Sequence, residues 1–243
     1  MITLIGTGHV FDLSSALIEN LDDKNPDVIC VELDSQRYNS LIMKHTSPES
    51  YKNVKKNAPI IYKLLARFQE SMAKEYGVNA GDEMLTAIKY AQSHQIPLEF
   101  IDMNAQNMFS KMLRSMSISE KFRLLLSGFV GIFVSKKSVE NELKKIEGEF
   151  DTYIEQIGSK FPTIKRTLID ERNLHMTTKL IKLMENHENI IACIGDGHIP
   201  GISKLLSSHN IEYDTIRLSK LRERKTSEFG TESAHFTTEY KSP

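Results

Sequence analysis

The chain has 243 residues, of which 40% are hydrophobic and 26% charged, with a formal net charge of -1 at pH 7. This length and apolar content suffice for one domain whose core needs no disulfide or metal to hold it. The basic residues are dispersed, so the chain lacks the positive field of a nucleic-acid-binding protein and we expect no nucleic-acid partner.

Only two cysteines occur, Cys30 and Cys193, and each falls inside an apolar run. This placement favours two buried thiols in a reducing compartment over a secreted disulfide framework. The amino terminus shows neither the basic region nor the long apolar region of a secretory signal peptide. We therefore expect a cytoplasmic location.

Five short runs rich in valine and isoleucine predict strands, and their apolar character is largely continuous rather than alternating. They lie at residues 2–5, 28–31, 98–101, 190–194 and 213–218. Helical patterns lie between them, at residues 13–21, 35–44, 60–76, 82–93 and 202–208. Continuous apolar strands are typical of a sheet covered on both faces. The alternation predicts an α/β fold with a largely parallel central sheet flanked by helices.

No convincing strand pattern occurs between residues 104 and 184, so we expect a helical insertion of about eighty residues there, before the last strands. Ser117 and Glu120 have the spacing of a capping box. Apolar residues between 139 and 157 predict a helix that buries one face, and Pro162 marks the first turn of a further helix. A single domain over residues 1–220, followed by a polar tail at 221–243, is the expected organisation.

Residues 124–134 are apolar on nearly all sides but too few to span a bilayer, which takes about twenty. A buried helix is the simplest interpretation of this stretch. Peripheral contact with a membrane and self-association into a homo-oligomer both stay open.

Two similar turns follow the first and the fourth predicted strand. One is Gly6-Thr7-Gly8-His9 and the other is Gly195-Asp196-Gly197-His198. Glycines let the backbone turn sharply, and the carboxyl ends of parallel strands meet at the crevice where open α/β folds bind ligands. We therefore expect His9 and His198 to converge although they are far apart in the sequence.

The other predicted strands also end in ionisable side chains. The second leads into Glu32, Asp34 and Arg37, and the third leads into Asp102. Histidine nitrogen and carboxylate oxygen suit Zn²⁺, Mn²⁺, Fe²⁺ or Co²⁺, and such an ion makes a bound water nucleophilic at neutral pH. A metal site at this edge is one interpretation, and an ordinary helix start capped by Asp34 is the other.

Two further glutamates occupy predicted helices. Glu83 lies near a helix start, where its charge favours the helix dipole. Glu171 lies four residues before His175, a spacing that by itself indicates a surface pair on one helix face. For both glutamates, structural and site roles stay open.

Taken in order, these residues resemble the TraB family, which includes the pheromone-shutdown protein PrgY and the GumN proteins. The resemblance runs from residue 2 to about 218 and rests on the two turns together with Val31-Glu32-Leu33-Asp34, Gly81-Asp82-Glu83-Met84, Ile101-Asp102 and Glu171-Arg172-Asn173. It implies a relation to the Tiki metalloprotease superfamily and a similarity to the erythromycin esterase and ChaN-like folds.

The resemblance implies a metal-dependent, peptidase-like hydrolase acting on a peptide or small-molecule substrate. The implied ligands of a divalent ion, Mn²⁺, Co²⁺ or Zn²⁺, are His9, Glu32 and His198. The implied catalytic residues are Glu83 or Glu171 as proton carrier, Arg37 or Arg172 as oxyanion or substrate anchor, and Asp102 beside them.

Two other functions stay open, a non-catalytic binder of a peptide or signal and a membrane-associated scaffold. Many microbial TraB proteins continue into membrane-spanning helices after this domain. We expect either a soluble branch of the family or a chain whose membrane part is missing here.

Overall fold

The structure is a computed structural model and describes residues 1–8, 13–46, 82–131, 155–156 and 158–223. Within these ranges it has a five-stranded sheet in the order β3-β2-β4-β1-β5, and every strand is parallel to its neighbours. The strands are β1 (Ile2–Thr7), β2 (Val28–Val31), β3 (Leu98–Phe100), β4 (Ile190–Gly195) and β5 (Tyr213–Ile216). All five predicted strands and the α/β class are confirmed, with small differences at strand ends.

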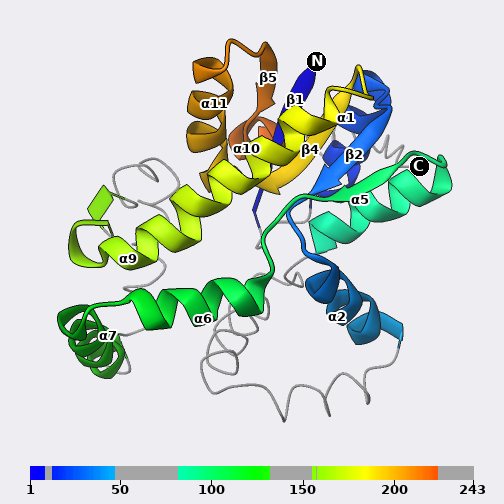
Figure 1. Cartoon of the computed structure of the whole chain (residues 1–243). Coiled ribbons are helices and arrows are strands. Elements are labelled where there is room, and N and C mark those ends of the chain that lie inside the picture. The colour runs from blue at the N-terminus through cyan, green and yellow to red at the C-terminus, as the bar shows by residue number, and fades with distance from the viewer. Residues whose placement is uncertain (9–12, 47–81, 132–154, 157, 224–243) are drawn as a thin grey trace, which may run out of the picture.

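Helices cover both faces of this sheet (Figure 1). They are α1 (Ser14–Lys24) and α5 (Asp82–Ser93) on one face, and α10 (Glu171–Leu183) and α11 (Ile199–Ser208) on the other. Leu17 and Ile88 pack with Cys193 on the first face, whereas Met176 and Ile202 pack with Cys30 on the second. Because both of their faces are buried, the central strands β1, β2 and β4 are largely continuous apolar runs in the sequence.

The order of the strands favours a ligand-binding crevice at their carboxyl ends. The chain leaves β1 and β2 over the face that α1 and α5 cover, whereas it leaves β4 over the face that α11 covers. Strand β4 lies between β2 and β1. Neighbouring strands whose connections diverge to opposite faces open a crevice between them, which is where such sheets bind ligands.

Other described helices are α2 (Ser35–Thr46), α6 (Ala105–Ser115), α7 (Ile118–Gly131) and α9 (Pro162–Lys165), with a π-helical turn (Arg166–Asp170) between α9 and α10. A 3-10 turn (Asp196–His198) joins β4 to α11. In Figure 1, α6 and α7 extend away from the sheet. The predicted capping box is confirmed, since the Glu120 N–H donates to Oγ of Ser117 at 3.2 Å and the Ser117 N–H donates to Oε2 of Glu120 at 3.0 Å.

Some expectations differ from the structure or fall outside its described part. Helix α7 takes up part of the stretch 124–134, yet Leu126 is 51% exposed rather than buried. The helices expected at 60–76 and from 139 onward, and the tail expected at 221–243, lie largely outside the described residues. No described helix has the length and apolar character needed to cross a membrane. Cys30 and Cys193 are buried free thiols, as expected.

Candidate functional site

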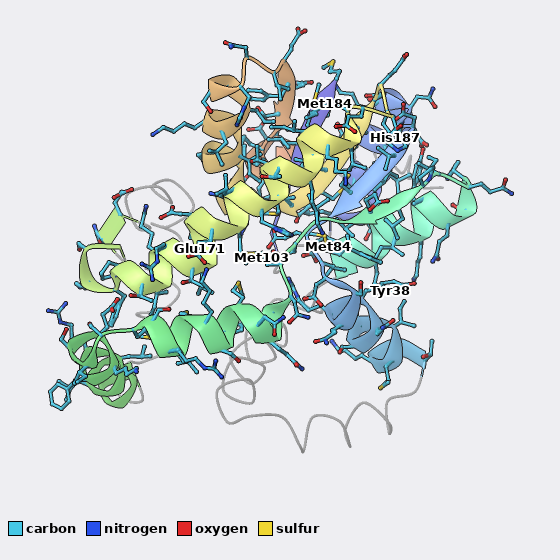
Figure 2. The ribbon with its side chains drawn as sticks, viewed as in Figure 1. Tyr38, Met84, Met103, Glu171, Met184 and His187 are labelled. Atoms are coloured by element: carbon cyan, nitrogen blue, oxygen red, sulfur yellow. The ribbon has the colours of Figure 1, made fainter. Side chains whose placement is uncertain are left out.

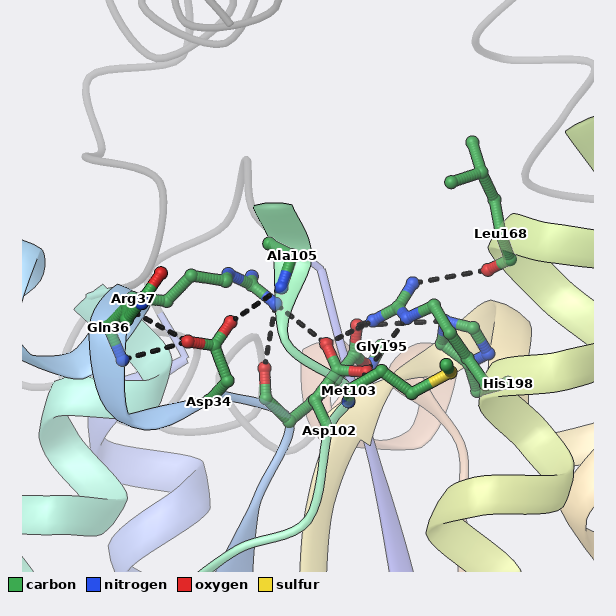
Figure 3. Close-up of polar contacts among 11 residues, drawn as sticks. Asp34, Gln36, Arg37, Asp102, Met103, Ala105, Leu168, Gly195 and His198 are labelled. Carbon is green, nitrogen blue, oxygen red and sulfur yellow. Dashed lines mark hydrogen bonds and ion pairs between the residues drawn. The ribbon is translucent and has the colours of Figure 1, made fainter. Parts of the chain in front are cut away.

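Glu32 belongs to a buried polar cluster at the carboxyl ends of β2 and β4. Figure 3 shows the cluster with Asp102, Gly195 and His198 labelled. Its Oε2 accepts a hydrogen bond from the Gly195 N–H at 2.6 Å, and its Oε1 pairs with Arg172. Burial is the largest influence and disfavours the charged carboxylate. The charge of Arg172, the nearby His198 ring, the charge of Arg37 and the Gly195 N–H together outweigh it and hold the pKa of Glu32 well below its ordinary value. Glu32 is therefore ionised at neutral pH.

Arg172 enters the cluster from α10 and joins carboxylates that come from two strands. Its Nε and Nη2 each lie 2.9 Å from an oxygen of Asp102, which makes a bidentate pair, and Nη2 also pairs with Glu32. Its Nη1 donates to the Leu168 carbonyl at 3.2 Å. Leu168 belongs to the π-helical turn that precedes α10, and such turns occur frequently at functional sites. The turn supplies an acceptor that fixes the guanidinium.

Asp34 and Arg37 bring the start of α2 into the same cluster. Oδ1 of Asp34 accepts from the N–H groups of Gln36 at 2.8 Å and of Arg37 at 3.1 Å, which is the geometry of an N-cap. Its Oδ2 accepts from the Ala105 N–H at 3.1 Å, at the start of α6. Nη1 of Arg37 donates to Asp102 at 2.8 Å. The segment therefore caps a helix and also contributes to the site.

His198 follows β4 and is 5% exposed. Its Nδ1 lies 2.6 Å from Oδ1 of Asn173. An amide oxygen only accepts, so Nδ1 carries the proton and Nε2 keeps a lone pair, 3.6 Å from Oε1 of Glu32. Burial is the largest influence on the pKa of His198 and lowers it, and the charge of Glu32 does not reverse that shift. The imidazole is neutral at pH 7.

Two glycines allow these close approaches. A Cβ at Gly201 would collide with Nδ2 of Asn173, so α11 needs glycine where the amide rests against it. A Cβ at Gly6 would collide with Oδ1 of Asp196, whose carboxylate Arg217 holds in a bidentate pair at 2.9 and 2.6 Å. Asp196 therefore brings the turn after β4 against the end of β1. His9, which continues the first turn, lies outside the described residues.

The two candidate glutamates have different neighbours. Glu171 lies in the first turn of α10 (Figure 2). Its carboxylate is 2.9 Å from Nζ of Lys111 on α6 and 3.7 Å from Nε of Arg166. Glu83 is 4% exposed in the first turn of α5, near the Cys193 thiol. Burial first, and the charge of Glu83 second, raise the pKa of Cys193 to about 12. Glu83 therefore lies near β4, and Glu171 lies toward α6.

The described residues supply two donors suited to a metal ion. Ligands 2.0–2.2 Å from a tetrahedral ion lie about 3.4 Å apart, which is close to the 3.6 Å between His198 Nε2 and Glu32 Oε1. The bond from Nδ1 to Asn173 is the outer contact that orients a ligating histidine. Arg172 competes at Oε1 of Glu32. No group of three acidic, histidine or cysteine side chains placed to hold a metal occurs in the described part of the chain.

Sequence reasoning did not assign roles to three residues near this site. Asn173 orients His198, and His175 and Lys179 reach the end of β3 from α10. His175 and Lys179 follow Arg172 by three and seven residues, so they share its helix face. This spacing is visible in the sequence. It indicates a site only when Arg172 is known to pair with Asp102 and Glu32, which the sequence does not show.

Comparison with known proteins gives a consistent family assignment. The sequence model of the TraB/PrgY/gumN family matches residues 1–212. An uncharacterized protein of Methanocaldococcus jannaschii is 30% identical over 236 residues, which cover 93% of this chain and 59% of that protein. A TraB domain-containing protein of Bos taurus is 24% identical over a match that covers 83% of this chain and 61% of that protein. A TraB domain-containing protein of Homo sapiens has the same identity and the same coverage of both chains. The chain thus spans about three fifths of these relatives.

Proposed function

This chain belongs to the TraB/PrgY/gumN family, and from that membership and the geometry of the Glu32–His198 pair we propose that it is a divalent-metal-dependent hydrolase of peptides or similar amides. The observation that supports it is the proton-free Nε2 of His198 facing the ionised Glu32 carboxylate at 3.6 Å. Both groups lie at the crevice where the strand connections diverge. His9 is the proposed third ligand.

Different residues of the chain have different roles in such a site. An ion such as Mn²⁺, Co²⁺ or Zn²⁺, when bound, supplies Lewis-acid activation of water. Asn173 keeps Nδ1 of His198 protonated, so that Nε2 stays a donor for the ion. Arg37 and Arg172 hold positive charge beside Asp102, where it can stabilise an oxyanion or anchor a substrate carboxylate.

Glu83 is the better proton carrier of the two glutamates in this proposal. Glu171 lies on the side toward α6, beside Lys111 and Arg166. Glu83 is buried near the end of β4, the strand that leads to His198.

A non-catalytic peptide binder is the second candidate, because one structural feature favours it. Both oxygens of Glu32 already have partners, Arg172 on Oε1 and the Gly195 N–H on Oε2. A carboxylate satisfied in this way needs no metal. In that case a captured peptide would be recovered chemically intact.

The test of the hydrolase is metal content and cleavage measured on the same preparations of the full chain. We expect chelator-free protein to retain a divalent ion and to cut members of a peptide library, followed by mass spectrometry. His198→Ala should weaken metal binding by about tenfold or more and abolish cleavage. His209→Ala, the same change at an exposed histidine, should alter neither.

Two outcomes would overturn the proposal. One is protein that takes up no Mn²⁺, Co²⁺ or Zn²⁺ and leaves the library intact. The other is cleavage that persists unchanged in His198→Ala.

A further inference from the structure

A cavity of about 420 Å³ that is widely open to solvent adjoins the cluster on the side of β3. Its lining residues are Asp34, Ser35, Gln36, Phe100, Asp102, Asn104, His175 and Lys179. The Phe100 ring packs against the ring of Tyr38 at 4.8 Å between centroids, which gives the cavity an apolar wall. The remaining lining is polar and shares Asp102 with the candidate site. A group bound here would lie next to the Arg172 network.

The two acidic side chains of the cavity are already satisfied. Asp102 pairs with both Arg37 and Arg172. Asp34 accepts hydrogen bonds from three backbone N–H groups, those of Gln36, Arg37 and Ala105. Carboxylates held in this way offer little to a cationic ligand, because their lone pairs are occupied.

The donors of the cavity are not satisfied to the same degree. Lys179 gives one of its three ammonium protons to the Phe100 carbonyl at 2.8 Å, at the end of edge strand β3, and pairs with no carboxylate among the described residues. The Ser35 hydroxyl and the Asn104 amide nitrogen likewise have no partner within the described residues. Asn104 is the N-cap residue of α6, and its Oδ1 accepts the capping hydrogen bond. Its amide nitrogen therefore remains available as a donor.

We propose that this cavity is a subsite for a carboxylate, with Lys179 as its charge partner and Ser35 and Asn104 as additional hydrogen-bond donors. One uncompensated ammonium beside two carboxylates suits a singly charged anion better than phosphate, which carries more charge. A carboxylate next to an amide-cleaving site belongs to a peptide that presents its carboxyl terminus or an acidic side chain. The identification of the ligand as a peptide substrate rests on the proposed function, whereas the anion site itself does not.

Binding can be measured without turnover, by following the His175 ring signal in the nuclear magnetic resonance spectrum of the full chain. The probes are trialanine with a free carboxyl terminus, its carboxyl-terminal amide and inorganic phosphate. His175→Gln assigns the signal. We expect trialanine to give a saturable shift of the His175 signal. The amide of trialanine should give a much smaller shift, and phosphate should bind more weakly than trialanine.

Substitutions then locate the charge partner. Lys179→Met should weaken trialanine binding by about tenfold or more, since a charge-assisted hydrogen bond is lost. Lys179→Arg keeps the charge and the donors, so it should retain binding and show that the position tolerates change. Lys182→Met, the same change at an exposed lysine on the same helix, should bind as the parent chain does.

Several results would overturn the subsite: equal binding of trialanine and its amide, phosphate binding tighter than trialanine, the absence of any saturable shift, or full affinity in Lys179→Met. The two proposals fail separately. A chain that binds trialanine through Lys179 but cleaves nothing keeps the subsite and loses the hydrolase. A chain that cleaves peptides with no dependence on Lys179 keeps the hydrolase and loses the subsite.

Discussion

Arg172 and Glu32 are both nearly enclosed, and each would be costly to bury alone. Removing a buried ion from water costs several kcal/mol, and only close pairing with further hydrogen bonds offsets it. Arg172 meets that condition through Asp102, Glu32 and the Leu168 carbonyl. The cluster is therefore an interdependent set in which each charge needs the others. Its neighbour His198, by contrast, is kept neutral and is oriented by an amide.

The contact between Gly201 and Asn173 gives a prediction whose sign is unusual. Glycine to alanine inside a helix normally stabilises by about 0.5–1 kcal/mol. Here the new Cβ would displace the Asn173 amide and break its bond to His198. We expect Gly201→Ala to destabilise by about 1 kcal/mol or more, because buried partners are left unsatisfied. Denaturant unfolding of the full chain measures it.

The matched control is the same change in an Asn173→Ala background. With the amide absent there is nothing to displace, so Gly201→Ala should become neutral or stabilising by about 0.5 kcal/mol. A destabilisation of equal size in both backgrounds would contradict the proposed contact.

Within the segment between β3 and β4, Glu120 connects two helices, α7 and α9. It closes the capping box of α7 with Ser117, and its Oε1 and Oε2 also accept from the N–H and Oγ–H of Thr163 in α9, at 2.8 and 2.9 Å. It is 4% exposed. Burial alone would raise the pKa of Glu120, but the hydrogen bonds from Thr163 and Ser117 outweigh it and lower the pKa. One carboxylate thus fixes the angle between α7 and α9.

Glu120→Gln should destabilise the chain by about 1–3 kcal/mol, since an amide group would face donors that need an acceptor. Because the folded pKa of Glu120 is depressed, its contribution is fully present above the ordinary carboxyl pKa of about 4.3 and is lost as pH falls through the folded pKa. The stability difference between parent and variant should therefore be constant down to about pH 5 and shrink below it.

Unfolding curves across acidic pH test this expectation. Glu185→Gln, at an exposed glutamate, provides the control and should lie close to the parent at every pH. A difference that grows toward acid would rule out the depressed pKa.

At the scale of the whole molecule, the central strands β2 and β4 carry the two thiols on opposite faces of the sheet. Cys30 and Cys193 are fully buried, and burial is the main reason that both pKa values are raised, that of Cys193 to about 12. A thiol that is neither ionised nor accessible does not react. Chemical labelling of either thiol therefore reports the opening of the sheet.

We predict that a thiol reagent labels neither cysteine in native buffer except through global unfolding. Both should react at the same slow rate, which should rise with denaturant in step with unfolding. In concentrated guanidinium, which unfolds the full chain, the reagent should label both thiols. Fast labelling of one cysteine under native conditions would mean that its strand opens locally.

The strands and most helices could be predicted from the sequence because their signals are local. Strand 190–194 is apolar at every position since both of its faces are covered, and the capping box at Ser117 needs only four residues. The site could be predicted in part, because Glu32 directly follows β2, His198 lies in the turn after β4, and parallel strands end at one edge. The exposure of Leu126 could not be predicted, since it depends on which face of α7 packs against the rest of the protein and which face meets solvent.

The pattern of apolar runs determined that this chain forms a helix-covered parallel sheet with ionisable groups at its carboxyl edge. Local patterning suffices there, since burial of a strand depends on the character of its own side chains. Only the tertiary structure decided that β4 lies between β1 and β2, that Arg172 joins Glu32 to Asp102, and that Asn173 orients His198. Those contacts join residues far apart in the chain, and their energies depend on distance and burial, which a linear pattern does not contain.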